Sequence, residues 1–239
     1  MHIRERLIVS LDVETDTQAL ALVETLREEV LFYKVGMQLF YHYGADLVRK
    51  IKQLGKNIFL DLKMHDIPNT VVSALQSLQD LDVDFINMHT LAGKEAMSKA
   101  KEYLMQHHNK TKLIGVTILT SLNDESLSQL GFHSPVTDTV IQLCHLAKSA
   151  HLDGVVSSAQ EAASIKKAVG DDFITICPGI RRSSDSADDQ KRVVTPAAAM
   201  EKQADYIVVG RPILLASDPK KEASFYFLEM EKGLKNARK

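Results

Sequence analysis

A short apolar run leads through a charged turn into a helical pattern in the stretch Ile58-Phe59-Leu60-Asp61-Leu62-Lys63-Met64-His65-Asp66-Ile67-Pro68-Asn69-Thr70. This order predicts a buried parallel strand that leads into a helix. Because side chains alternate along a strand, we expect Asp61 and Lys63 on the same side of it. Asp66 follows three residues after Lys63, so two carboxylates and an ammonium group converge on a small volume. Burial of such charges costs free energy, which favours a chemical role over the alternative, a surface ion-pair network.

The same unit of strand and helix recurs along the chain. Apolar runs that predict strands occur at residues 7–11, 31–35, 57–62, 85–88, 113–119, 154–157, 173–177 and 206–209. Amphipathic stretches that predict helices occur at residues 17–29, 38–54, 70–81, 94–107, 137–150, 159–169, 196–202 and 219–234. Eight units in a chain of 239 residues predict a single (β/α)8 (TIM) barrel, with residues 1–239 as one catalytic domain. An open sheet with extra strands is the structural alternative.

Composition restricts the class of function. The chain is 45% hydrophobic and 25% charged, which is typical of a globular protein. Its net charge of −2 provides no basic field, so we expect neither nucleic acid nor a membrane as a partner. No apolar stretch has membrane length, and no signal-peptide core precedes the first strand. The two cysteines have no metal-like spacing, which argues against a disulfide scaffold and favours a cytoplasmic location.

In a (β/α)8 barrel the active site lies at the C-terminal ends of the strands. Polar groups gather at those predicted ends, namely Asp12, Lys34, Asp61, Lys63, His89, Thr90, Thr120, Ser121, Ser157, Ser158, Arg181, Gly210 and Arg211. Two loops, at residues 122–136 and 179–195, exceed the usual length of such connections. The second loop is polar enough to form a mobile lid over a ligand.

Two turns that contain Gly and Arg indicate a phosphate site. Barrels often bind phosphate after strands seven and eight, through backbone N–H groups at a helix N-terminus. Gly210 permits close approach of the backbone to an anion, and Arg211 offers a fork for bidentate bonding. Residues 178–181, which end in Arg181, form a similar turn after strand seven. For a single turn, the alternative is a helix start with an exposed Arg.

With these motifs in place, the chain resembles orotidine 5'-phosphate decarboxylases of the bacterial type. The matching segments keep the family's order through nearly the whole chain and are Leu11-Asp12, Tyr33-Lys34-Val35-Gly36, Phe59 to Thr70, Leu119-Thr120-Ser121, Cys177-Pro178-Gly179-Ile180-Arg181 and Val208-Val209-Gly210-Arg211-Pro212-Ile213. The segment Phe59 to Thr70 is the most specific of them. The resemblance implies decarboxylation of orotidine 5'-monophosphate at C6 to uridine 5'-monophosphate, the last step of de novo UMP synthesis, with no cofactor and no metal.

The resemblance also implies catalytic roles. Lys63 would donate the proton to C6, and Asp61 would face the substrate carboxylate. Lys34, Asp61, Lys63 and Asp66 would form an array of alternating charge. Asp66, together with Ile67 and Thr70, would reach into the active site of the neighbouring subunit in a homodimer.

Further residues would bind the rest of the substrate. The resemblance assigns Asp12 and Lys34 to the ribose hydroxyls, Thr120 and Ser121 to the pyrimidine, and Arg181, Gln190, Gly210 and Arg211 to the phosphate. Within this set Gln190 would bridge the phosphate and the base from the closed lid.

Two other functions stay open. A metal-dependent barrel lyase could share the Asp-x-Lys-x-x-Asp pattern, but such enzymes have a carboxylate at the end of strand two, where this chain has Lys34, and a cation there opposes metal binding. A non-catalytic barrel that binds pyrimidine nucleotides would need the phosphate and ribose groups but not Lys63. For His65 we favour a packing or surface role over that of a general base. His89 is either a hydrogen-bonded core histidine or part of the floor of the site. For Asp153 and Asp205, which precede strands, we expect structural roles.

Overall fold

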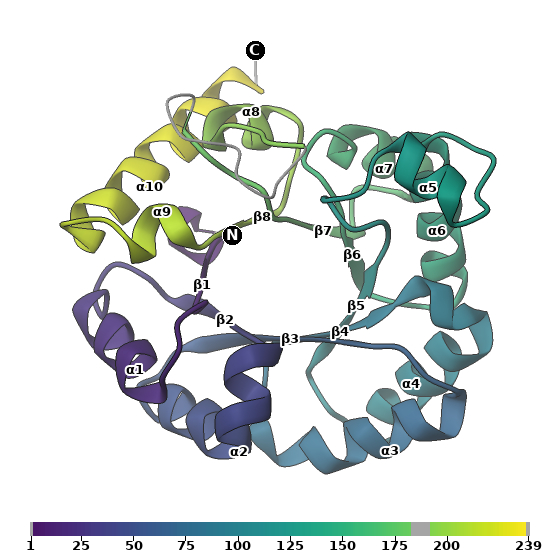
Figure 1. Cartoon of the computed structure of the whole chain (residues 1–239), viewed down its shortest axis with the longest axis horizontal. Helices are drawn as coiled ribbons and strands as arrows, with labels where there is room; N and C mark the ends of the chain where they lie inside the picture. Colours follow the sequence, from purple (N-terminus) through teal and green to yellow (C-terminus); the bar gives the residue numbers. More distant parts are fainter. Residues whose placement is uncertain (1, 183–191, 238–239) are drawn as a thin grey trace.

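The computed structural model describes residues 2–182 and 192–237. In this part of the chain eight parallel strands close into a barrel in the order of the sequence, with β8 hydrogen-bonded to β1, and the helices form an outer ring (Figure 1). The strands are β1 (Leu7–Ser10), β2 (Phe32–Gly36), β3 (Asn57–Met64), β4 (Phe85–His89), β5 (Lys112–Val116), β6 (Gly154–Val156), β7 (Ile174–Cys177) and β8 (Tyr206–Val209). The predicted (β/α)8 barrel is thus confirmed, and the open sheet is excluded.

The α-helices follow the strands as the amphipathic stretches predicted, with two additions. They are α1 (Asp16–Thr25), α2 (Met37–Gln53), α3 (Pro68–Leu78), α4 (Gly93–Gln106), α5 (Asp124–Gln129), α6 (Val136–Ser149), α7 (Ala162–Val169), α8 (Pro196–Glu201), α9 (Arg211–Leu214) and α10 (Pro219–Asn236). Short 3-10 helices span Ile3–Glu5, Gln79–Leu81 and Thr90–Ala92. The additions are α5, inside the predicted long loop 122–136, and α9. No helix in the described ranges is long and apolar enough to cross a membrane.

Two strands end two or more residues away from their predicted positions. β5 stops at Val116 instead of residue 119, because its neighbour β6 offers only three residues for pairing. Both the backbone N–H and the hydroxyl of Thr117 donate to the Val156 carbonyl, which closes this ladder. β3 instead runs beyond residue 62 to Met64, through an irregularity in its register with β4.

The barrel has an apolar interior that closes its centre. One cluster of buried residues, separate from the core between strands and helices, contains Ile8, Phe32, Phe59, Phe85, Ile114, Ile176, Tyr206 and Val208. The Phe85 ring centroid lies 5.0 Å from both the Phe32 and the Tyr206 centroids. Because aromatic and branched side chains fill the centre, a ligand can be admitted only at an end of the barrel.

Three carboxylates repeat one arrangement at the N-terminal ends of β4, β6 and β8. Each stands just before β4, β6 or β8, accepts a backbone N–H of the preceding strand and pairs with a lysine. The sets are Asp84 with Ile58 N (2.8 Å) and Lys52 (3.2 Å), Asp153 with Leu113 N (2.8 Å) and Lys101 (2.5 Å), and Asp205 with Thr175 N (2.8 Å) and Lys166 (2.6 Å). These contacts give Asp153 and Asp205 the structural role expected, far from the strand ends that carry the site.

Candidate active site

A row of alternating charges lies at the C-terminal ends of β2 and β3. The Lys34 ammonium is 3.2 Å from one Asp61 oxygen, and the Lys63 ammonium is 2.7 Å from the other. The Lys34 and Asp61 side chains are only 13% and 10% exposed, whereas Lys63 is 28% exposed. Lys34 thus anchors the carboxylate from the barrel wall, and Lys63 is the more accessible cation of the row.

The charges of this row hold one another in their ionised forms. Burial by itself would raise the pKa of Asp61, but Lys34, Lys63 and a hydrogen bond from Asn87 outweigh it, so the pKa of Asp61 lies below its usual value. Burial by itself would lower the pKa of Lys34, but Asp61 and Asp12 outweigh it, so the pKa of Lys34 lies above its usual value. Both groups therefore carry their charges at neutral pH.

The backbone at Lys63 is not the regular strand that alternation assumes. Its φ angle is +51°, in the left-handed region that a non-glycine residue adopts only at a cost. The irregular register between Leu60 and Met64 accompanies this conformation. The predicted contact between Lys63 and Asp61 is present. It forms at an irregular strand end, and not by the regular alternation of side chains from which it was predicted.

Asn87 on β4, which the sequence analysis missed, ties this strand end together. Its side-chain oxygen accepts the Lys63 backbone N–H at 2.7 Å, and its side-chain nitrogen donates to Asp61 Oδ1 at 2.7 Å. Asn87 is fully buried, and a buried amide needs partners of this kind. The available signal was a polar residue between Ile86 and Met88 in an otherwise apolar run.

Asp12 extends the charged row at the end of β1. Its Oδ1 lies 3.3 Å from the Lys34 ammonium, and its Oδ2 accepts a hydrogen bond of 2.7 Å from the Ser10 hydroxyl. The Asp12 side chain is 55% exposed and thus accessible to a ligand. Across from it, a Cβ at Gly210 would lie 3.1 Å from Asp12 Oδ2, so a side chain at that position would crowd the carboxylate.

The charged row forms one wall of a cavity of about 310 Å³ at the C-terminal end of the barrel. Other parts of the lining are apolar. The predicted residues Thr120 and Ser121 also line the cavity. The lining consists of Ser10, Asp12, Lys34, Phe59, Asp61, Lys63, Val116, Ile118, Leu119, Thr120, Ser121, Val156, Pro178, Gly179, Arg181, Val208, Gly210 and Arg211. A small planar ligand could therefore meet charge on one side and an apolar surface on the other.

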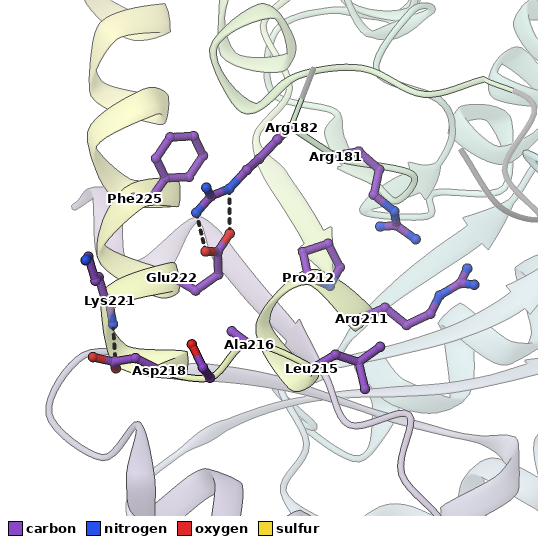
Figure 2. Close-up of a pocket in the computed structure, with 11 residues that line it drawn as sticks. Arg181, Arg182, Arg211, Pro212, Leu215, Ala216, Asp218, Lys221, Glu222 and Phe225 are labelled. Atoms are coloured by element: carbon purple, nitrogen blue, oxygen red, sulfur yellow. Dashed lines mark hydrogen bonds and ion pairs between the residues drawn. The ribbon is translucent and has the colours of Figure 1, made fainter. Parts of the chain in front are cut away.

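Two arginines stand at the β7 and β8 side of the cavity. Arg181 follows Gly179, whose φ of +76° favours glycine, and Arg211 is the first residue of α9. The Arg181 side chain, from the loop after β7, and the Arg211 side chain, from the start of α9, extend toward the same region (Figure 2). Arg181 is 6% exposed and donates to the Ile180 carbonyl at 3.0 Å. Two guanidinium groups on one cavity form a natural site for a phosphate.

Three predicted residues lie elsewhere. Asp66, Ile67 and Thr70 are exposed and do not line the cavity of their own chain. Asp66 accepts the Ile67 backbone N–H at 2.7 Å. Of the four charges of the predicted array, Lys34, Asp61 and Lys63 meet within the described part of one chain, and Asp66 does not join them. Gln190 lies outside the described residues.

The two histidines near the row contact each other. The His65 and His89 ring centroids are 5.2 Å apart, and neither residue lines the cavity. Burial, followed by the nearby His65 and Lys63, holds the pKa of His89 below its usual value. His65 is exposed, in line with the packing or surface role expected of it. The buried Nδ1 of His89 has no hydrogen-bond partner in the described part of the chain, so the expectation of a hydrogen-bonded core histidine was wrong.

Fold and site together define a class, namely (β/α)8-barrel proteins with a charged, arginine-flanked cavity at the C-terminal ends of the strands. The chain belongs to the orotidine 5'-phosphate decarboxylase / HUMPS family, whose sequence profile matches residues 5–226. The resemblance found in the motifs is thereby confirmed.

Relatives support this assignment over most of the chain. An orotidine 5'-phosphate decarboxylase of Carboxydothermus hydrogenoformans is 52% identical over 231 residues, which cover 95% of this chain and 96% of the relative. One from Nitrosococcus oceani is 43% identical, covering 90% of this chain and 93% of the relative. The crystal structure of orotidine 5'-phosphate decarboxylase from Lactobacillus acidophilus matches with a TM-score of 0.83 and 38% identity, covering 95% of this chain and 99% of that one.

Proposed function

We propose that this decarboxylase converts orotidine 5'-monophosphate to uridine 5'-monophosphate and CO2, with Lys63 as the proton donor and without a cofactor. The observation that carries the proposal is the contact of Lys63 with Asp61, beside Lys34, at a cavity that also holds Arg181 and Arg211. Family membership and the names of the relatives support the reaction and its place in pyrimidine synthesis.

The cavity offers complementary groups for each part of the substrate. The phosphate would bind Arg181, Arg211 and the backbone at Gly210. The ribose hydroxyls would meet Asp12 and Lys34, which are already paired at 3.3 Å. With both ends held, the pyrimidine would lie against Thr120 and Ser121, and its C6 carboxylate would be directed toward Asp61 and Lys63.

The chemical step needs a cation close to C6. When the bond to the carboxylate breaks, CO2 leaves and the electron pair stays on C6 as a vinylic carbanion. A preorganised ammonium group stabilises such charge most strongly inside a closed site. Lys63 would give one proton to C6 as the carbanion forms or just after, and its neutral amine would regain a proton from water. The repulsion between Asp61 and the substrate carboxylate is relieved as CO2 departs.

The charged row disfavours a metal-dependent lyase, the nearest alternative. The two carboxylates of the row, Asp12 and Asp61, have the Lys34 ammonium between them at 3.3 Å and 3.2 Å. A divalent cation at this position would be repelled by Lys34. We expect activity to survive a strong chelator, and its loss in chelator would favour the metal-dependent alternative.

We propose that the enzyme is a homodimer with shared active sites. Apolar residues are exposed at the C-terminal ends of three consecutive strands, Met37 and Tyr41 after β2, Ile67 after β3 and Leu91 after β4. Exposed apolar residues gathered in one sector of the rim are typical of an interface, and Asp66 stands in the same sector. A mixture of Asp66→Asn and Lys63→Ala subunits should recover activity through hybrid sites. Confirmed mixed dimers without recovery would exclude shared sites.

Substitution Lys63→Ala tests the mechanism directly. We expect near-total loss of turnover, measured as the decrease in orotate-nucleotide absorbance in metal-free buffer, while calorimetry still detects binding of uridine 5'-monophosphate. Unchanged turnover would exclude Lys63 as the proton donor. If the wild-type protein bound the nucleotide without any turnover, the non-catalytic nucleotide-binding alternative would hold instead.

We further propose that residues 1–239 act as one catalytic domain in the cytoplasm. A continuous core connects the strands to the surrounding helices throughout the described ranges. Cys144 and Cys177 are free and buried, and burial raises the pKa of the Cys144 thiol to about 12. Unpaired, unreactive thiols are compatible with a reducing compartment.

A further inference from the structure

A second arginine, Arg182, is clamped on the outer side of the cavity rim. Its guanidinium forms a fork with Glu222, with Nε donating to Oε1 at 2.8 Å and Nη2 donating to Oε2 (Figure 2). The same guanidinium lies 3.8 Å from the centroid of the Phe225 ring. Glu222 and Phe225 are three residues apart on α10 and therefore face the same way. We call Arg182, Glu222 and Phe225 the α10 clamp.

The clamp acts on the chain segment that carries Arg181. Ile180 pairs with Val194 in a parallel bridge, where Arg181 N donates to the Val194 carbonyl at 3.1 Å and Val194 N donates to the Gly179 carbonyl at 3.2 Å. Successive side chains of such an extended segment project to opposite sides. Attachment of Arg182 to α10 therefore directs Arg181 the other way, toward the cavity (Figure 2).

We propose that Arg182 is a positioning residue, which orients Arg181 for the phosphate of the ligand through the α10 clamp. The idea rests on the proposed function in one respect, the binding of phosphate by Arg181. A flexible arginine must be ordered when it binds an anion, and a held one loses less freedom. Glu222 also offsets the positive charge of Arg182 through this ion pair.

The clamp uses a side chain outside the motif that indicated the phosphate site. Arg182 does not line the 310 Å³ cavity, but it borders a neighbouring one of about 790 Å³ that shares Arg181 and Arg211 with it. The clamp connects α10 to the loop after β7 through Arg182 and Glu222, which are 40 residues apart in the sequence. A purely structural role would tie the helix to the barrel without affecting recognition of phosphate, and this difference can be measured.

The test compares two ligands that differ only in the phosphate. Wild type, Arg182→Ala, Arg182→Lys and Glu222→Gln are assayed for kcat and KM, and for competitive inhibition by uridine 5'-monophosphate and by uridine. For Arg182→Ala we expect KM to rise and inhibition by the nucleotide to weaken by about tenfold, the factor that ordering one more flexible side chain would cost. Inhibition by uridine should change less than about twofold, because uridine has no phosphate. The kcat should also change less than about twofold, because the lost phosphate interaction stabilises the bound substrate and the transition state equally.

Lys148→Ala is a matched control. Lys148 pairs with Asp172 at 2.9 Å and lies 5.3 Å over the Phe173 ring, so it also joins a cation, a carboxylate and an aromatic side chain, away from the site. Its removal should leave both inhibition constants unchanged.

Each outcome decides the proposal. If the variants weakened inhibition by the nucleotide and by the nucleoside equally, the ratio of the two inhibition constants would not change. That result would overturn the proposal and leave the clamp with a structural role only. If Arg182→Ala does not fold, Glu222→Gln and Arg182→Lys decide by the same ratio. If wild type itself fails to prefer the nucleotide over the nucleoside, the phosphate role of Arg181 is wrong and the positioning role falls with it. A normal wild-type preference with an unchanged ratio in the variants refutes the positioning role alone.

Discussion

Asn87→Ala removes the residue that joins β4 to the bulged end of β3. In the native structure its amide makes two hydrogen bonds of 2.7 Å, one from the Lys63 backbone and one to Asp61. Alanine can make neither. The substitution thus tests whether the left-handed backbone at Lys63, and with it the position of the ammonium group, depends on Asn87.

The expected loss of stability follows from these two bonds. A hydrogen bond to a charged group contributes about 1.5–3 kcal/mol, and a buried N–H left without a partner costs about 1–3 kcal/mol. Asn87 is fully buried, so water cannot easily replace the amide. We therefore expect the free energy of unfolding to fall by about 3–5 kcal/mol.

The expected loss of activity is larger than stability alone would explain. A left-handed conformation costs a non-glycine residue about 1–2 kcal/mol, and without Asn87 the N–H bond no longer offsets this cost at Lys63. A misplacement of about 1 Å at a reacting group can reduce the rate about 100-fold. We expect kcat to fall by about this factor at a temperature where the variant is folded.

Urea unfolding and steady-state kinetics check both numbers, with Leu113→Ala as the control. Leu113 is fully buried on β5 in the core between strands and helices, outside the charged row. Its truncation should cost about 2–5 kcal/mol and leave kcat nearly unchanged. If Asn87→Ala kept wild-type kcat, or if Leu113→Ala lost as much activity at equal stability, the argument that Asn87 positions Lys63 would be refuted.

Two further predictions concern charges. Folding lowers the pKa of Asp61, so the stability that its ionised carboxylate contributes is fully present above the usual carboxyl pKa range and is lost as pH falls through that range and below it. Between neutral pH and about pH 3, the free energy of unfolding should therefore fall more steeply for wild type than for Asp61→Asn. Parallel curves for the two proteins would contradict the lowered pKa. Lys166→Met should cost about 3–5 kcal/mol in a thermal or urea unfolding experiment, because it leaves the Asp205 carboxylate without its cation. Adding Asp205→Asn should recover part of the loss, and strictly additive costs would show that the two side chains are not coupled.

The sequence by itself determined the barrel and the composition of its rim. Eight apolar runs alternating with amphipathic stretches predict parallel strands with helices outside, because each strand must be covered on both faces. Once the strands are parallel, their C-terminal ends meet at one rim, so Asp12, Lys34, Asp61 and Arg211 could be assigned to one site from their positions alone. This inference needs the order of the elements and not their detailed geometry.

Only the tertiary structure decided how that rim is held. Asn87 reaches Lys63 because the register of β3 and β4 is irregular after Leu60, and hydrophobic patterns do not encode such a bulge. Arg182 pairs with Glu222, which is 40 residues away in the sequence. Such contacts depend on which side chains the completed barrel brings within hydrogen-bond distance. The local periodicity of the sequence predicts which face of a helix or strand a residue occupies. The residue that it contacts on the facing element is determined by the packing of the whole chain.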